Sequence, residues 1–377
     1  MEKQIGENNI ANSENELFLK EQIITYIGNK RKLLPYIESV IKDIIQETGE
    51  KRFRCADLFS GSGIVARMLK KYSSSLIVND MEGYSRVINE CYLTNKEDFD
   101  ELLYEQYKNE ILKQCENLQE GIIAQNYAPK DKDNIQKGER VFFTPRNAKY
   151  IDTVRKAIDS IDEKYRKFFI APLLYEASVH ANTSGVFKGF YKSSKTGIGK
   201  YGGDGENCLN RILADIELKK PVLSNFSSEV SVYQEDTNKL AKNLKDLDIV
   251  YLDPPYNQHG YGSNYFMLNT ILNNKLGKDL SSVSGIPNDW NRSSYNKKGE
   301  VLKVFEELIK DLDSRYIIIS YNSEGFMSKE DITNMLMKHG ELKTIEIKYN
   351  TFRGSRNLKD RDIYVNEYLF VLKKEAC

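Results

Sequence analysis

The sequence predicts an α/β fold in which one domain is assembled from both ends of the chain and interrupted by a mainly helical insertion. Three observations indicate this. An apolar strand, a glycine-rich turn and a helix follow one another at 54–71, and a second apolar strand ends in an acidic residue at 76–80. Apolar strand-like runs then return only after residue 229. A strand, a helix and a strand of these lengths form a βαβ unit, and the stretch between the two groups of strands is an insertion.

The composition is that of a globular chain of about two to three domains. Of 377 residues, 40% are hydrophobic, and 55 basic residues balance 55 acidic ones. No apolar run reaches the ~18 residues of a membrane helix, and the polar, acidic first residues do not form a secretory signal. The five cysteines are scattered without a C-x-x-C pair, which excludes a disulfide framework and a zinc site. We therefore expect a cytoplasmic protein with no metal and no membrane partner.

The first part of the chain divides into three segments. We expect residues 1–20 to form a polar, loosely docked tail and residues 21–92 to begin the α/β domain. The segment 23–47 breaks at Gly28 and then places apolar residues at helical spacing. Residues 93–228 form the insertion, where helical segments such as 151–178 precede a stretch rich in Gly, Lys, Ser and Tyr at 183–204. That stretch is too polar to form a core.

Residues 229–377 complete the α/β domain. The segment 229–255 predicts a strand, a short helix and an apolar strand, followed by a helix near 298–313 and a buried strand at 315–322. Two alternating runs at 341–350 and 365–374 predict a hairpin at the edge of the sheet.

Two features follow the strands of the βαβ unit. Asp57 ends the first strand, and Gly61 and Gly63 follow it, where glycines let the backbone turn sharply and approach a ligand. Asp80 ends the second strand, where a carboxylate can accept hydrogen bonds from ribose hydroxyls. The alternatives are a plain strand-to-helix turn for the glycines and a helix cap for Asp80. Together, the two features favour a ligand that carries a ribose.

The most specific signal is Asp253-Pro254-Pro255-Tyr256, which directly follows an apolar strand. Two prolines fix the backbone and hold the aspartate and the tyrosine rigidly at the carboxyl end of that strand, where open α/β sheets bind ligands. An acceptor carboxylate, an acceptor carbonyl and an aromatic plate suit an exocyclic amine on a flat base. The alternative is a rigid turn with a surface tyrosine.

A third candidate motif lies near the N-terminus. Tyr26, Gly28 and Lys30 combine an aromatic ring, a glycine and a cation, which suit a charged cofactor tail. The alternative is a helix entry with a solvated lysine.

In this order, the motifs resemble those of the S-adenosylmethionine-dependent DNA adenine-N6 methyltransferases of the Dam-like, or D12, class. YIGNK, DLFSGSG, VND and DPPY match the family's motifs, and a long insertion separates the cofactor half from the catalytic half. The resemblance covers about 20–90 and 230–374. It implies a Rossmann-like, mostly parallel sheet of seven strands with one antiparallel strand, and a target-recognition insertion.

The resemblance also implies roles for individual residues. The cofactor would be bound by Tyr26, Gly28, Lys30, Asp57, Phe59, Gly61, Gly63 and Asp80, with Asp236 at its adenine amine. The target base would be held by Asp253, Pro254, Pro255 and Tyr256. The base would have to be flipped out of the duplex to reach them.

Contacts to double-stranded DNA need basic residues, which the chain supplies locally. Lys188, Lys192 and Lys195 alternate with aromatic residues in the insertion, and Arg353 and Arg356 belong to a second basic cluster. Such residues neutralise phosphates. The alternative for each cluster is a solvated loop.

Three functions stay open at this point. The first is an adenine-N6 DNA methyltransferase, either stand-alone or the partner of a cognate restriction endonuclease. The second is the methylation of another amine, such as cytosine N4, an RNA base or a protein glutamine, because DPPY-type motifs also serve those amines. The third is a DNA-binding subunit with an inactive cofactor site.

Overall fold

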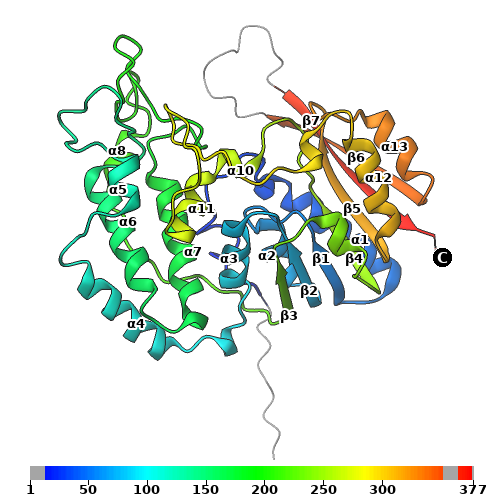
Figure 1. Cartoon of the computed structure of the whole chain (residues 1–377). Helices are drawn as coiled ribbons and strands as arrows, with labels where there is room; N and C mark the ends of the chain where they lie inside the picture. Colours follow the sequence, from blue (N-terminus) through cyan, green and yellow to red (C-terminus); the bar gives the residue numbers. More distant parts are fainter. Residues whose placement is uncertain (1–12, 351–363, 376–377) are drawn as a thin grey trace, which may run out of the picture.

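A computed structural model describes residues 13–350 and 364–375, which fold around one seven-stranded sheet (Figure 1). The strand order is β3-β2-β1-β4-β5-β7-β6. All neighbouring pairs from β3 to β5 are parallel, whereas β7 is antiparallel to both β5 and β6. The predicted mostly parallel sheet with one antiparallel strand is confirmed, and so is the hairpin at its edge.

The strands are β1 (Phe53–Asp57), β2 (Ser73–Asn79), β3 (Glu229–Tyr233), β4 (Leu247–Leu252), β5 (Ser314–Asn322), β6 (Gly340–Asn350) and β7 (Tyr364–Lys374). The α-helices are α1 (Leu34–Thr48), α2 (Ile64–Lys70), α3 (Gly83–Tyr92), α4 (Glu101–Gln114), α5 (Ile122–Tyr127), α6 (Pro145–Ile158), α7 (Glu163–His180), α8 (Leu209–Leu213), α9 (Thr237–Ala241), α10 (Tyr261–Asn264), α11 (Phe266–Asn273), α12 (Val301–Asp311) and α13 (Lys329–Leu336). Short 3-10 turns η1 (Lys30–Leu33), η2 (Lys96–Asp98) and η3 (Ser294–Asn296) complete the chain.

The two faces of the sheet are buried in two separate cores. Successive side chains of a strand point to opposite faces, so in β4 Ile249 and Tyr251 join the core with α1, α2 and α3, while Val250 and Leu252 join the core with α9, α12 and α13. Burial on both faces explains why β4 is a continuous apolar run.

The first residues of the described chain are tied to the sheet by Arg67 on α2. Its guanidinium donates to the backbone carbonyls of Phe18 (2.9 Å), Glu21 (3.0 Å) and Gln22 (2.8 Å) and lies over the ring of Tyr92. Phe18 belongs to the segment that was expected to dock loosely, yet its side chain is fully buried. Arg67 thereby fixes the direction in which the chain runs on to Tyr26.

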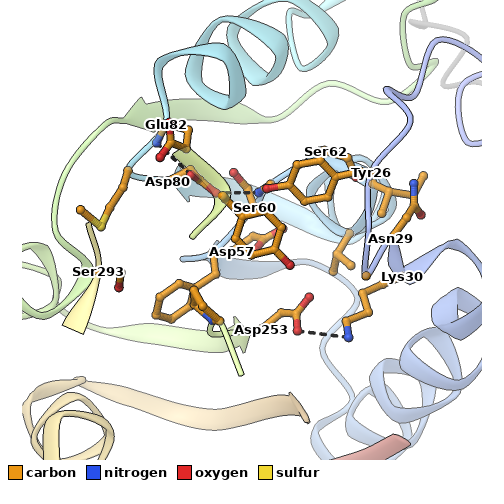
Figure 2. Close-up of a pocket in the computed structure, with 18 of the residues that line it drawn as sticks. Tyr26, Asn29, Lys30, Asp57, Ser60, Ser62, Asp80, Glu82, Asp253 and Ser293 are labelled. Carbon is orange, nitrogen blue, oxygen red and sulfur yellow. Dashed lines mark hydrogen bonds and ion pairs between the residues drawn. The ribbon is translucent and has the colours of Figure 1, made fainter. Parts of the chain in front are cut away.

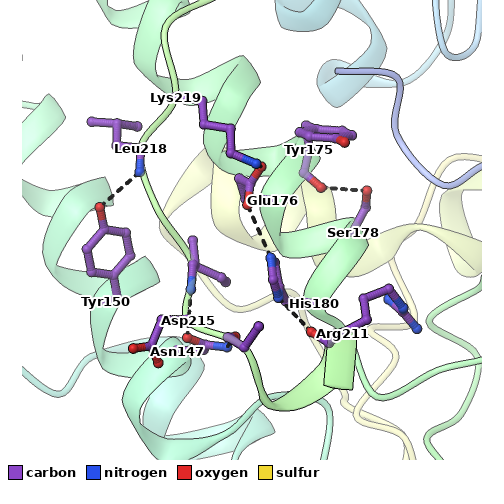
Figure 3. Close-up of polar contacts among 12 residues, drawn as sticks. Asn147, Tyr150, Tyr175, Glu176, Ser178, His180, Arg211, Asp215, Leu218 and Lys219 are labelled. Carbon is purple, nitrogen blue, oxygen red and sulfur yellow. Dashed lines mark hydrogen bonds and ion pairs between the residues drawn. The ribbon is translucent and has the colours of Figure 1, made fainter. Parts of the chain in front are cut away.

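The helices α4 to α8 lie to one side of the sheet (Figure 1), and α7 packs against α3 and α11. Polar contacts join α6 and α7 to the segment 214–219 (Figure 3). Glu176 accepts a hydrogen bond from His180 (3.2 Å) and forms an ion pair with Lys219 (2.9 Å), and the hydroxyl of Tyr150 accepts from the backbone N–H of Leu218 (3.2 Å). Both ring nitrogens of His180 have partners, as a structural histidine requires.

The polar stretch 183–204 is not all surface. Phe187 is buried against Phe142 and Phe143, and Gly199 packs on Val141. The whole stretch was expected to lie outside any core, and this expectation is wrong for Phe187, because its backbone N–H bonds to the carbonyl of Asn264 beside α11.

Within the described residues, no helix is long and apolar enough to cross a membrane. In the same part of the chain, no three His, Cys, Asp or Glu side chains are grouped as a metal ion needs.

Candidate active site

The carboxyl ends of β1, β2 and β4 meet at one edge of the sheet and frame a pocket (Figure 2). Parallel neighbours end on the same side, so the residues that follow these strands are brought together. The pocket is lined by residues of four sequence motifs, namely Tyr26, Gly28, Lys30, Asp57, Phe59, Gly61, Asp80, Asp253 and Pro255. The structure thereby places most of the expected site residues in one wall.

The glycine turn after β1 is held by Asp80. One carboxylate oxygen of Asp80 accepts from the backbone N–H of Gly61 (2.8 Å) and the other from that of Glu82 (2.9 Å). Gly61 has a φ of +50°, and a Cβ added there would lie 2.9 Å from the ring of Tyr26. This position requires glycine both for its backbone conformation and for the close approach of the tyrosine.

Gly63 has a different task from Gly61. It precedes α2 with a φ of +76°, and an added Cβ would lie 2.5 Å from Oδ1 of Asn89 on α3. Gly63 is not part of the pocket wall, and its lack of a side chain lets α2 and α3 approach each other.

A cluster of tyrosines forms the side of the pocket nearest the N-terminal motif. The ring of Tyr26 stacks on Tyr265 at 4.5 Å and on Tyr261 at 5.0 Å between ring centroids, and its hydroxyl lies 3.2 Å from that of Tyr84. Gly28, with a φ of +79°, faces the hydroxyls of Tyr261 and Tyr256. The cluster offers aromatic faces, which attract cations.

Lys30 is buried between two carboxylates. Its Nζ lies 3.2 Å from Oδ1 of Asp253 and 2.5 Å from Oε1 of Glu367 on β7. Burial disfavours the charged amine, but the two carboxylates outweigh this effect and hold the pKa of Lys30 well above its usual value. Burial raises the pKa of Asp253 to about 7, although Lys30 opposes the rise.

The other carboxyl groups of the pocket make it strongly acidic. Asp57 is fully buried, and among residues 13–350 and 364–375 neither of its carboxylate oxygens has a hydrogen-bond partner. Burial, together with the charges of Asp253 and Asp80, raises its pKa well above the usual value. Burial also raises the pKa of Glu82 to about 7. Lys30, the one lysine that lines the wall within the described part of the chain, is already shared by two carboxylates, so a cationic ligand would satisfy these groups best.

Several predicted residues lie outside the pocket wall. Asp236 accepts from the backbone N–H of Lys239 (3.1 Å) as the N-cap of α9. Tyr256 is adjacent to the wall, with its ring 5.9 Å from Nζ of Lys30. Pro254 is buried and is not among the lining residues. Lys188, Lys192 and Lys195 lie on the loop after α7, and Arg353 and Arg356 lie outside the described residues.

Sequence reasoning missed several residues of the site and its support, and five of them are polar residues that bear on its charge and hydrogen bonds. Glu82, Asn291, Ser293 and Asn296 line the pocket, and Glu367 holds Lys30. Asn296 donates to the carbonyl of Asn257 in the loop after the DPPY motif (2.7 Å). For Glu367, the sequence offers one signal that could have revealed its role, because it is an acid within the apolar run of a predicted strand.

Comparison with known proteins agrees with this geometry. Residues 26–335 match the family profile described as D12 class N6 adenine-specific DNA methyltransferase. The type II methyltransferase M.NlaIII of Neisseria lactamica is 34% identical over 366 residues, which cover 93% of this chain and 99% of that protein. The type II methyltransferase M.CviAII of Paramecium bursaria Chlorella virus 1 is 30% identical, with 92% and 97% covered. The modification methylase StsI of Streptococcus sanguinis is 29% identical and longer, so that 93% of this chain matches 52% of it.

Proposed function

The chain belongs to the D12 class of N6 adenine-specific DNA methyltransferases, and we propose that it transfers the methyl group of S-adenosylmethionine to an adenine flipped out of duplex DNA. The observation that supports this most directly is the meeting of the DPPY aspartate, the glycine turn and the N-terminal motif in one acidic pocket. The relatives M.NlaIII and M.CviAII are named type II methyltransferases, so we also propose that a cognate restriction endonuclease accompanies this enzyme.

The pocket fits S-adenosylmethionine in charge and in shape. This cofactor carries an ammonium and a sulfonium, and the unpartnered carboxylate of Asp57 is suited to the ammonium. Gly61 lets the ring of Tyr26 pack directly against the turn at the pocket wall, because a side chain there would collide with that ring. We assign Tyr26, Gly28, Lys30, Phe59 and Gly61 to the same cofactor site, with Gly63 as its support.

The ribose end of the cofactor site has two acids. Asp80 already accepts two backbone N–H groups, but each carboxylate oxygen retains a further lone pair for a hydroxyl. Glu82 lines the same wall and receives a hydrogen bond from Asn269 (2.7 Å). For the adenine amine we keep Asp236 as the proposed partner, although it lies outside the wall and caps α9.

The chemistry of the target amine explains the DPPY motif. The lone pair of adenine N6 is delocalised into the ring, which makes the amine a poor nucleophile. We propose that Asp253 and the carbonyl of Pro254 accept hydrogen bonds from this amine and concentrate the lone pair on nitrogen, while Tyr256 stacks on the base and Pro255 fixes the turn. When bound, S-adenosylmethionine supplies the methyl group as an electrophile. In this proposal the Asp253 carboxylate takes the proton that the methylated amine releases.

The insertion, residues 93–228, is the proposed target-recognition domain, and residues 21–92 and 229–377 form the proposed catalytic domain. Nζ of Lys188 lies 3.3 Å from Nδ1 of His259, just after the DPPY motif. The basic loop of the insertion therefore adjoins the catalytic turn. We propose that Lys188, Lys192 and Lys195, together with Arg353 and Arg356, contact DNA phosphates.

Single-molecule sequencing of plasmid DNA from a methylation-free host tests the function. The host expresses the wild type, Asp253→Ala, or the control Asp43→Ala, which removes an exposed acid of α1 paired with Lys343 on β6. We expect N6-methyladenine at one recurring motif with the wild type and the control. In purified form, Asp253→Ala should lose roughly 10²- to 10⁴-fold in turnover and keep its DNA binding. Absence of any modified base with the wild type would contradict the proposed function, and wild-type turnover in Asp253→Ala would contradict the role of that residue.

A further inference from the structure

Glu367 is a buried acid on β7 with more polar partners than a structural position in an apolar strand requires. Its side chain is 5% exposed, and one oxygen accepts from both Nζ of Lys30 (2.5 Å) and the hydroxyl of Ser320 (2.8 Å). Its other oxygen accepts from the amide of Asn322 (3.1 Å). Ser320 and Asn322 stand on β5, which pairs with β7, so neighbouring strands fix the direction of this carboxylate.

The lysine held by Glu367 is the one that faces the catalytic aspartate. The ammonium of Lys30 lies closer to Glu367 (2.5 Å) than to Asp253 (3.2 Å). Glu367 is almost fully enclosed, whereas the side chain of Asp253 is 19% exposed and lines the pocket. The ammonium therefore stabilises the Asp253 carboxylate from the protein side, and the carboxylate keeps acceptor capacity toward the pocket.

We propose that Glu367 is a positioning residue for methyl transfer, which holds Lys30 behind Asp253 so that the Asp253 carboxylate stays available to the target amine. This inference rests on the proposed function. Glu367 touches neither base nor cofactor and acts through Lys30. Without its charge, the buried ammonium would have Asp253 as its one remaining anionic partner and would draw that carboxylate away from the base.

The pH dependence of the reaction should depend on how Lys30 and Glu367 surround Asp253. Asp253 is faced by Lys30 from η1, Glu367 from β7, Tyr251 from β4 and Asp57 from β1, with Tyr256 and Tyr261 beside it. Only its carboxylate form accepts hydrogen bonds from the amine at both oxygens, so activity falls as the pH drops through its pKa. Lys30 lowers that pKa and Glu367 raises it. Loss of the Glu367 charge should therefore move the acid limb to lower pH, and loss of the Lys30 charge should move it to higher pH.

The experiment compares wild type, Glu367→Gln, Glu367→Asp and the control Glu306→Gln, which alters an exposed acid paired with Lys338. For Glu367→Gln we expect kcat to fall roughly 10- to 100-fold, the size of effect that displacement of a reacting group produces. The KM for DNA and the Kd for S-adenosylmethionine should stay within about twofold of wild type, because the fold and the binding surfaces are kept. The acid limb of kcat should move to lower pH. Glu367→Asp keeps the negative charge, so the acid limb of its kcat–pH profile should stay at the pH of the wild type. Its kcat should lie between those of wild type and Glu367→Gln.

A double-mutant cycle separates positioning from a merely structural role. If Glu367 acts through Lys30, then Lys30→Met combined with Glu367→Gln should be no slower than Lys30→Met alone. Losses that multiply, or an acid limb that does not move in Glu367→Gln, would overturn the proposal. If Glu367→Gln does not fold, Glu367→Asp decides, and a wild-type kcat in that variant would overturn it. A wild type without methyl transfer would instead count against the proposed function.

Discussion

At the scale of single residues, the site is made by side chains and glycines that each satisfy one physical requirement. Lys30 carries a charge that burial would disfavour, and two carboxylates retain it. Asp57 lies buried with both oxygens unpartnered, which costs folding free energy unless a ligand supplies the missing contacts. The folding stability of the protein is thus lower because of the group to which we expect a cation to bind. Functional sites often depart in this way from the requirements of a well-packed core.

Gly61→Val should weaken cofactor binding. The added side chain would collide with the ring of Tyr26 and would have to adopt a φ of +50°. Overpacking of this kind costs about 1–3 kcal/mol, which corresponds to roughly 5- to 150-fold in Kd if the whole cost falls on binding. Isothermal titration with S-adenosylmethionine measures the change.

Gly299→Val is the matched control for this substitution. A Cβ at Gly299 meets nothing within 4 Å, and this residue has no positive φ. An affinity unchanged in Gly61→Val would remove the glycine turn from the cofactor site.

At the scale of elements, one buried amide connects the loop 183–204 to the helices. Asn182 follows α7 and is fully buried. Its side-chain amide donates to the carbonyl of Val141 (2.8 Å), and its side-chain oxygen accepts from the backbone N–H of Gly202 (2.9 Å). The loop 183–204, which has few apolar residues of its own, therefore depends on this residue for its shape.

Asn182→Ala should destabilise the protein and weaken DNA binding together. Loss of the buried amide leaves the carbonyl of Val141 and the N–H of Gly202 without their partner, at a cost of about 1–3 kcal/mol each. We expect a lower free energy of unfolding and a raised KM for DNA, while the affinity for S-adenosylmethionine is kept. Urea denaturation and steady-state kinetics measure the two effects. Asn243→Ala, at an exposed position after α9, is the control. A normal KM for DNA in Asn182→Ala would mean that the loop's shape does not matter for recognition.

At the scale of the whole molecule, a chain of zero net charge is proposed to bind a polyanion. This is possible only if basic residues are concentrated where DNA lies. Lys188, Lys192 and Lys195 lie on the loop after α7, and Lys188 reaches His259 beside the DPPY turn. Many other surface lysines are paired with acids, among them Lys42 with Glu38 and Lys338 with Glu306.

Replacement of Lys188, Lys192 and Lys195 by glutamine should weaken DNA binding and flatten its dependence on salt. Each phosphate contact contributes about 0.9 to the slope of log K against log salt concentration, so three lost contacts lower the slope by up to about 2.7. Fluorescence anisotropy at several salt concentrations measures it. The control replaces Lys42 on α1, Lys303 on α12 and Lys338 just after α13, each paired with an acid, and should leave the slope unchanged. An equal slope in both triple variants would place DNA elsewhere on the surface.

The sequence by itself determined those parts of this protein that depend only on residues close together in the chain. The βαβ unit, the glycine turn and the proline-stiffened DPPY motif are local patterns, and the parallel strand order then brings Asp57, Asp80 and Asp253 to one edge without further information. The apolar spacing after Gly28 likewise predicted α1, whose buried face holds Ile37, Ile41 and Ile44.

Only the tertiary structure decided which distant residues complete the site. Glu367 reaches Lys30 because β7 inserts antiparallel between β5 and β6, and strand order is set by the packing of both faces rather than by any local signal. The same holds for Asn291 and Glu82, which the loop before η3 and the start of α3 bring to one wall. Asp236 is the opposite case. Its spacing from Asp253 along the chain predicted a place in the site, whereas its side chain caps α9 and does not line the pocket wall. The physical reason is that burial and charge pairing act between residues that lie far apart in the chain. A pattern of residues adjacent in the sequence carries no information about such contacts.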